Sequence, residues 1–150
     1  MKKKLLLFGL PVVLLLVAAF AVKTFVLGGG GPDEAALAKE PGPVYAMPEP
    51  FVVNLADGGE VPRFAKVGVA LRLSKLSAGE LQEASGDKPA YVEDDAELRD
   101  IVIDTLQRRT TAQLGTPGGR VAVKREILSR VNEETPLKAV DVYYTEFAVQ

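Results

Sequence analysis

Carboxylates are the side chains in this sequence that gather most densely, and paired carboxylates can act as general acid and base or bind divalent cations. The densest group is Glu93, Asp94, Asp95 and Glu97. These four acids also precede an apolar pattern with helical spacing, where negative charge stabilises the start of a helix. We therefore favour a helix-capping role, in which Asp94 and Glu97 form a capping box. A carboxylate-dependent hydrolase is the alternative.

Other catalytic and cofactor chemistry finds little support in the composition. The chain contains no cysteine and no histidine, which removes thiolate nucleophiles, disulfides, most zinc sites and the commonest general base. The glycine-rich residues 115–120 lack the Gly-Lys-Ser/Thr ending of a phosphate-binding loop. We predict no catalytic residues, no cofactor, no metal site and no enzymatic activity.

Charge is segregated along the second half of the chain. Residues 80–104 carry a formal net charge of −7, and residues 105–130 carry +5. Opposite charges on one subunit favour head-to-tail contacts between copies, and such contacts can close into a ring. The alternative, which we prefer, is that two antiparallel helices neutralise each other within one subunit. The candidate partner or assembly surface consists of Asp94, Asp95, Asp100, Asp104, Arg108, Lys124 and Arg125.

Three of these residues share one predicted helix face. Asp100, Asp104 and Arg108 follow one another at intervals of four residues, a spacing that brings side chains together on a helix. They form either a solvated, salt-bridged face or a face for a partner. The formal net charge of −2 for the whole chain, with lysines concentrated near its start, leaves the rest acidic. Nucleic acid is therefore not an expected partner.

The first residues are strongly apolar. No charged residue interrupts residues 5–22, and Lys2, Lys3 and Lys4 precede them. This pattern predicts a transmembrane helix with a cytoplasmic N-terminus, and a cleaved signal peptide is the alternative. The predicted organisation is a cytoplasmic N-terminus and transmembrane helix over 1–27, a flexible linker over 28–44 and an extracytoplasmic domain over 45–150. The expected location is the cytoplasmic (inner) membrane, with a single span.

The remaining pattern predicts an α+β domain of order β-β-α-α-β. Alternation predicts strands over 51–55 and 64–73, and β-branched and aromatic residues predict another over 140–149. Apolar residues at helical spacing predict a helix over 95–112 and a second, opened by Thr116 and Pro117, that ends near Glu134. In the last strand, Phe147 is expected to face opposite to Tyr144. Residues 74–91 are read as a surface excursion.

Several segments in a fixed order resemble the flagellar basal-body-associated FliL family. They are residues 51–57 (FVVNLAD), 63–67 (RFAKV), 98–110, 119–132 and the terminal 142–150 (VYYTEFAVQ), together with the apolar N-terminal stretch. The resemblance covers most of the chain outside the linker. The sequence departs from the family pattern in the long stretch 74–91 and in the additional glycine of the pair Gly118 and Gly119.

The resemblance implies a domain similar to the stomatin-type (SPFH-like) fold. It also implies a non-enzymatic accessory protein of the bacterial flagellum that associates with the stator units and basal body, self-associates in a ring and supports torque, motility and swarming. A general membrane-anchored scaffold is the alternative from the same class of protein.

Overall fold

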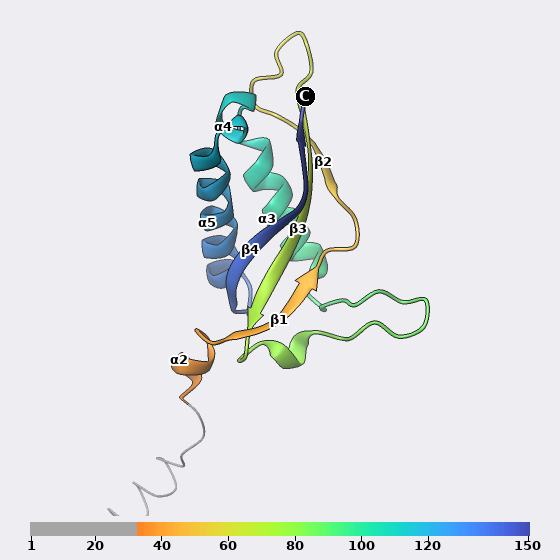
Figure 1. Cartoon of the computed structure of the whole chain (residues 1–150), viewed down its shortest axis with the longest axis vertical. Helices are drawn as coiled ribbons and strands as arrows, with labels where there is room; N and C mark the ends of the chain where they lie inside the picture. Colours follow the sequence, from red (N-terminus) through yellow and green to blue (C-terminus); the bar gives the residue numbers. More distant parts are fainter. Residues whose placement is uncertain (1–32) are drawn as a thin grey trace, which may run out of the picture. The chain divides into compact units, whose positions relative to one another are not determined.

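The structure is a computed structural model that describes residues 33–150. Four strands and the helices that pack against them follow the order shown in Figure 1. The elements are α2 (Glu34–Leu37), β1 (Pro41–Ala46), β2 (Phe51–Asn54), β3 (Phe64–Ser74), η1 (Ala78–Glu80), α3 (Asp95–Gln107), α4 (Thr111–Gly115), α5 (Pro117–Glu134) and β4 (Ala139–Val149).

Strand β3 is the centre of an antiparallel sheet. It pairs with β4 along one side, and with β2 and β1 one after the other along the opposite side. Its alternating sequence places Val67, Val69 and Leu71 on the core face, where all three are fully buried, as period-2 alternation requires. The prediction of a strand over 64–73 is confirmed.

Strands β1 and β2 follow the same edge of β3, separated by Pro48 and Pro50. Proline has no backbone N–H and cannot donate to a strand ladder, so the prolines interrupt this edge. The Met47 N–H still donates to the Val69 carbonyl at 3.1 Å, which continues the pairing of β1 up to the interruption. Strand β1 was missed by the sequence reading, which assigned residues up to 44 to a linker.

A bulge in β4 changes which side chains face the core. Gly68 pairs with Glu146 and the next residue, Val69, pairs with Tyr144, so Thr145 is an extra residue in β4. Phe147 therefore lies on the same face as Tyr144, and their ring centroids are 4.9 Å apart. The prediction that they face opposite ways was wrong, because strict alternation fails across a bulge. A Cβ on Gly68 would lie 2.3 Å from Thr145 Oγ1, so the bulge depends on glycine there.

Helices α3 and α5 cover one face of the sheet (Figure 1). Each presents an apolar stripe at helical spacing to the core. The buried residues of α3 are Leu98, Ile101, Val102, Thr105 and Leu106, and those of α5 are Val123, Ile127 and Val131. The predicted stripes of both helices are confirmed.

The predicted helix over 95–112 is divided in two. Helix α3 ends at Gln107, and Thr110 starts α4 with a capping box in which its side chain accepts from Gln113 N–H and Gln113 Oε1 accepts from the Thr110 N–H. The predicted start of the next helix is confirmed, since Thr116 Oγ1 accepts from the Gly119 N–H and Pro117 occupies the first turn.

These elements correct the fold class read from the sequence. The described domain is a mixed α/β structure with an antiparallel sheet, and the order β-β-α-α-β omitted β1, α4 and the two short elements α2 and η1. The predicted transmembrane helix is also corrected: none of the helices within residues 33–150 has the length and apolar character needed to cross a bilayer. The stretch to which that prediction referred, residues 1–27, lies outside the described residues.

Candidate functional site

The acidic residues at the start of α3 have separate roles. Asp94 is the residue that precedes the helix, but its side chain makes no capping hydrogen bond, so the predicted capping box at Asp94 and Glu97 was wrong. Asp95 instead accepts a hydrogen bond of 2.5 Å from the buried Tyr45 hydroxyl of β1. Burial, followed by this hydrogen bond, raises the pKa of the Tyr45 phenol well above its ordinary value. Asp95 therefore ties α3 to the sheet edge.

Asp104 joins α3 to α5. Its carboxylate lies 2.6 Å from Arg108 of the same helix region and 2.7 Å from Arg130 of α5. Arg130 also bonds Glu134 at 2.7 Å, and this hydrogen bond lowers the pKa of the Glu134 carboxyl. Charges of opposite sign thus neutralise each other across the α3–α5 contact, as the intramolecular alternative predicts.

A second ion pair joins the two helix regions, and the order of the two pairs along the chain shows that the helices are antiparallel. Arg109, just after α3, pairs with Glu126 of α5, whereas Asp104, earlier in the chain, pairs with the later Arg130. Arg109 and Arg130 are each only about one-fifth exposed in their side chains (19% and 20%). These pairs stabilise the domain interior and leave little of Asp104 for a partner.

Three other candidate residues differ from Asp104 and Arg108 in that they form no ion pair in the part of the chain that the structure describes. They are Asp100, Lys124 and Arg125. Asp100 and Arg125 are exposed, Lys124 is half-buried, and none of the three forms a salt bridge within residues 33–150. Asp100 lies on α3 and the two cations lie on α5. Of the seven candidate surface residues, these three and Asp94 are the ones with charge available for another molecule. Their role in assembly stays a prediction.

Basic side chains of α5 lie over aromatic rings of β4. The Lys124 ammonium is 4.9 Å from the ring centre of Tyr144 and 5.9 Å from that of Tyr143, within the range of cation–π attraction. The Arg120 guanidinium is 5.6 Å from the Phe147 ring. Sequence reasoning missed this arrangement, because it depends on the bulge that turns Phe147 toward α5.

Tyr144 anchors this aromatic group to the helix. Its hydroxyl donates to the Arg120 carbonyl at 3.1 Å, and burial raises the pKa of Tyr144 to about 12. On the outer side of β4, Arg72 Nε donates to the Tyr143 hydroxyl at 3.0 Å. Tyr144 therefore remains neutral at ordinary pH, and the hydrogen bonds of the two hydroxyl groups fix both rings as surfaces for the cations.

Four surface hollows in the described part of the chain lack paired carboxylates. Four hollows, with volumes from about 220 to about 560 Å3, each contain at most one acidic residue in their lining. Within residues 33–150 no three acidic side chains come together in a group that could hold a metal ion. The hydrolase alternative requires two carboxylates facing each other across a cleft, and these hollows do not provide them.

Two polar side chains hold loops in place and were not recognised in full from the sequence. Asp57, after β2, accepts hydrogen bonds from the Thr111 N–H and hydroxyl at the start of α4, and the backbone N–H lowers the pKa of the Asp57 carboxyl. Asn132, near the end of α5, bonds both the N–H and the carbonyl of Ala139. These contacts close the ends of the helical layer onto the sheet.

Comparison with known proteins gives a consistent family relationship. The family model described as "Flagellar basal body-associated protein FliL" matches residues 44–150. The chain is also 33% identical over 112 residues to the flagellar protein FliL of Aquifex aeolicus (strain VF5), an alignment that covers 74% of this chain and 63% of that protein. The chain thus spans less than two thirds of the length of this relative. On the extent of the family match and this identity, the chain belongs to the FliL family of flagellar basal body-associated proteins.

Proposed function

We propose that this protein is a non-enzymatic accessory of the flagellar motor that associates with the stator units and supports torque, motility and swarming. The observation that carries the proposal is the family match over residues 44–150, which contains the second half of β1 and all of the elements from β2 to β4. The whole folded layer of sheet and helices is therefore the part related to basal-body proteins.

The charged surface supports a role in binding other proteins. Arg125, on the side of α5 toward β4, has no carboxylate partner in the described part of the chain, and Asp100 on α3 has no basic partner there. Exposed charges of this kind steer and orient protein contacts more than they add affinity. The four hollows, which lack paired carboxylates, favour an interaction role over catalysis.

We also propose that copies of the protein associate with one another. The unpaired acids lie toward the start of α3 and the unpaired cations on α5, so the two kinds of charge occupy different parts of one subunit. Exposed ion pairs contribute only ~0–1 kcal/mol each and are screened by salt. Charge therefore orients the subunits, and other contacts must hold them.

Removal of the protein should weaken the motor without removing the flagellum. In a strain that lacks the gene, we expect swarming on firm agar to fall at least about twofold, because load increases the demand on the stators, while electron microscopy still shows normal filaments. Expression of the full chain from a plasmid should restore swarming. Unchanged swarming would contradict the proposal and favour a scaffold unrelated to motility, and absence of filaments would indicate a role in assembly of the basal body instead.

A further inference from the structure

Helix α5 uses its basic residues in two different ways. Arg130, which faces α3, is held by Asp104 and Glu134. On the side toward β4, Lys124 and Arg125 have no such partner among the residues that the structure describes. The neutralised side closes the domain interior, and the opposite side presents positive charge.

Lys124 lies beside the open edge of β4, which is the edge that does not pair with β3. Consecutive residues of a strand point to opposite faces of a sheet, so Tyr143 and Tyr144 lie on different faces. The Lys124 ammonium is within 6 Å of both rings (5.9 and 4.9 Å), and it reaches both because it lies beside the strand edge that separates the two faces.

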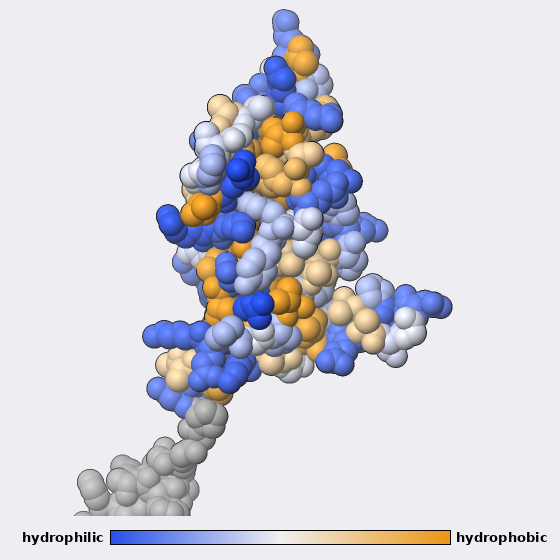
Figure 2. All heavy atoms as spheres, viewed as in Figure 1, coloured by the Kyte–Doolittle hydropathy of each residue, from blue (hydrophilic) through white to orange (hydrophobic). Residues whose placement is uncertain are grey.

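The edge of β4 beside Lys124 has no strand partner. Within residues 33–150, β4 pairs only with β3, and an unpaired edge offers its backbone N–H and carbonyl groups to another strand. Residues 141–144 pair regularly with β3 between two bulges. A hollow of about 220 Å3 lies alongside, lined by Val121, Lys124, Arg125, Leu128 and Asp141. Figure 2 shows hydrophobic and hydrophilic atoms interspersed over α5 and β4.

The opposite side of the domain carries a projecting hairpin, residues 82–91, which we call the arm. Bridges between Gln82 and Tyr91 and between Ser85 and Lys88 hold it together, and its tip contains Gly86 at φ +59°, a conformation that glycine favours. Residues 82–89 are exposed. The arm carries Glu83, Asp87 and Lys88, a formal net charge of −1, and further acids, including Glu93 and Asp94, follow at its base.

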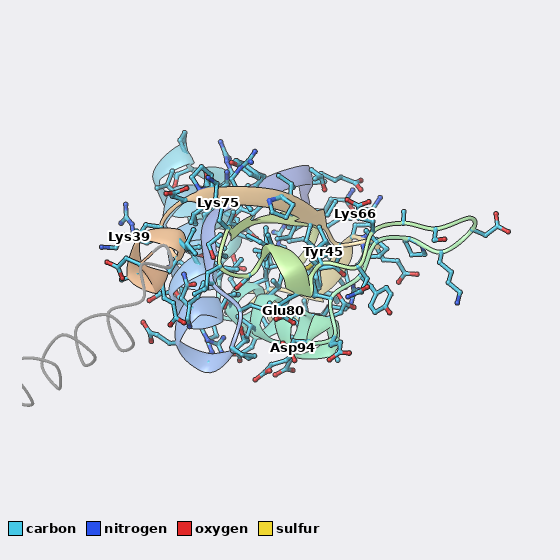
Figure 3. The ribbon with its side chains drawn as sticks, turned by 90° about the horizontal axis from the view of Figure 1, so that it is seen from below. Lys39, Tyr45, Lys66, Lys75, Glu80 and Asp94 are labelled. Atoms are coloured by element: carbon cyan, nitrogen blue, oxygen red, sulfur yellow. The ribbon has the colours of Figure 1, made fainter. Side chains whose placement is uncertain are left out.

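The arm and the open edge of β4 face away from each other in one subunit. Figure 1 shows α5 at the left and the arm extending to the right, and in the view from below in Figure 3 the arm, the pale green loop, again extends to the right, away from the body. The arm therefore cannot reach its own β4. A contact between the two requires a second copy of the chain.

We propose that the arm of one copy docks on the open edge of β4 and the basic side of α5 in the next copy. The inference rests on the self-association proposed above and specifies its interface. The arm, a hairpin held by two isolated bridges, extends the neighbour's sheet by main-chain hydrogen bonds at residues 141–144. In this contact the Val142 N–H exchanges the Asp141 carboxylate, to which it donates in the single subunit, for a carbonyl of the arm. Glu83 and Asp87 approach Lys124 and Arg125, whose positive charge outweighs the single carboxylate of Asp141 in the hollow.

This contact is head-to-tail, because it joins two different surfaces. Such contacts propagate from copy to copy and close into a ring when the rotation between copies allows it. The same charges oppose like-to-like contacts, since arm against arm places acid against acid and edge against edge places base against base.

Crosslinking between two kinds of chain tests the interface directly, because the natural sequence has no cysteine. Full-length chains with Ala84→Cys in the arm are co-expressed with differently tagged full-length chains with Val121→Cys on α5, which is 52% exposed, and treated with a short bismaleimide. We expect a mixed dimer and no dimer from either variant alone. Val61→Cys, 66% exposed in the loop before β3, replaces Ala84→Cys as the control and should give little product.

Charge reversal gives the second part of the test. Lys124→Glu with Arg125→Glu should reduce the mixed dimer roughly two- to fivefold, as expected from exposed ion pairs, and Glu83→Lys with Asp87→Lys in the partner chain should restore it. Circular dichroism confirms that each variant is folded. Equal crosslinking at Val61→Cys, dimers from a single variant, an unchanged yield after charge reversal, or loss without restoration would each overturn the interface.

The crosslinking test of the interface can succeed or fail independently of the test of the proposed stator role. Crosslinking of the arm to α5 reports on the contact between copies, whereas recovery of stator proteins with the full chain reports on the motor association. A mixed dimer without stator proteins would leave the interface standing and contradict the stator role. Recovery of stator proteins without the mixed dimer would support the stator role and contradict the interface.

Discussion

Replacement of Ile101 by alanine should lower the free energy of unfolding by about 2–5 kcal/mol, the usual cost of truncating a large aliphatic side chain in a packed core. Ile101 is 1% exposed and belongs to the core cluster between α3 and the sheet. Domains of this size have a total stability of only ~5–15 kcal/mol. We therefore expect the midpoint of thermal unfolding, followed by circular dichroism, to fall by several degrees.

Asp100→Ala on the same helix is the matched control. Asp100 is exposed and has no salt bridge in the described structure, so its removal should change the unfolding midpoint very little. Asp104 is unsuitable as a control, because its carboxylate holds Arg108 and Arg130. Equal effects of Ile101→Ala and Asp100→Ala would mean that α3 presents a different face to the sheet.

Gly119→Ala should also destabilise the domain strongly. A Cβ at Gly119 would lie 1.7 Å from the Gln113 carbonyl oxygen and 2.9 Å from Thr116 Oγ1. The backbone of α4 and the start of α5 would have to separate, and Thr116 would lose its hydrogen bond from the Gly119 N–H. Overpacking typically costs about 1–3 kcal/mol, and loss of the cap about 1 more. Urea unfolding of the variant measures the sum.

The preceding residue provides the control for this prediction. A Cβ at Gly118 meets no atom within 4 Å, and both glycines lie in the first turn of α5. Because alanine is favoured over glycine in a helix by up to ~1 kcal/mol, Gly118→Ala should leave stability unchanged or raise it slightly. If both variants unfold at the same urea concentration as the natural chain, the close packing of α4 against α5 is incorrect.

The parts of the fold that the sequence predicted are those governed by local pattern. The alternation over 64–73 predicted β3, and the sequence Thr116-Pro117 predicted the start of α5. In both cases a periodic apolar pattern coincides with local turn or capping chemistry. The stripe of α3 was predicted correctly for the same reason.

The features that the sequence did not predict depend on partners distant along the chain. The bulge at Thr145 exists because β4 must stay in register with β3 around Gly68, and nothing within residues 140–149 signals it. Strand β1 contains two prolines and forms because β3 offers an edge to pair with. The acids near the start of α3 indicated a capping box, but Asp95 bonds Tyr45, which lies 50 residues away.

In the candidate surface, too, some features follow from the local sequence and others depend on residues distant along the chain. Sequence charge alone identified the acidic and basic stretches, yet it could not tell paired from available charges. Asp104 and Arg108 are paired within the subunit, and Asp95 accepts from Tyr45. Lys124 and Arg125 remain available because they lie on the side of α5 that faces the edge of β4 rather than α3. That side is set by the packing of the two helices.

The proposed association with stator units is tested most directly by recovery of stator proteins with the tagged full chain from detergent-solubilised flagellated cells. We expect stator subunits to be enriched at least about tenfold over an untagged control, and the enrichment to fall as salt rises, because exposed charges orient the contact. The folded variant Gly118→Ala should behave as the natural chain. Recovery of basal-body proteins without stator subunits, from cells in which the stators are assembled, would contradict the account.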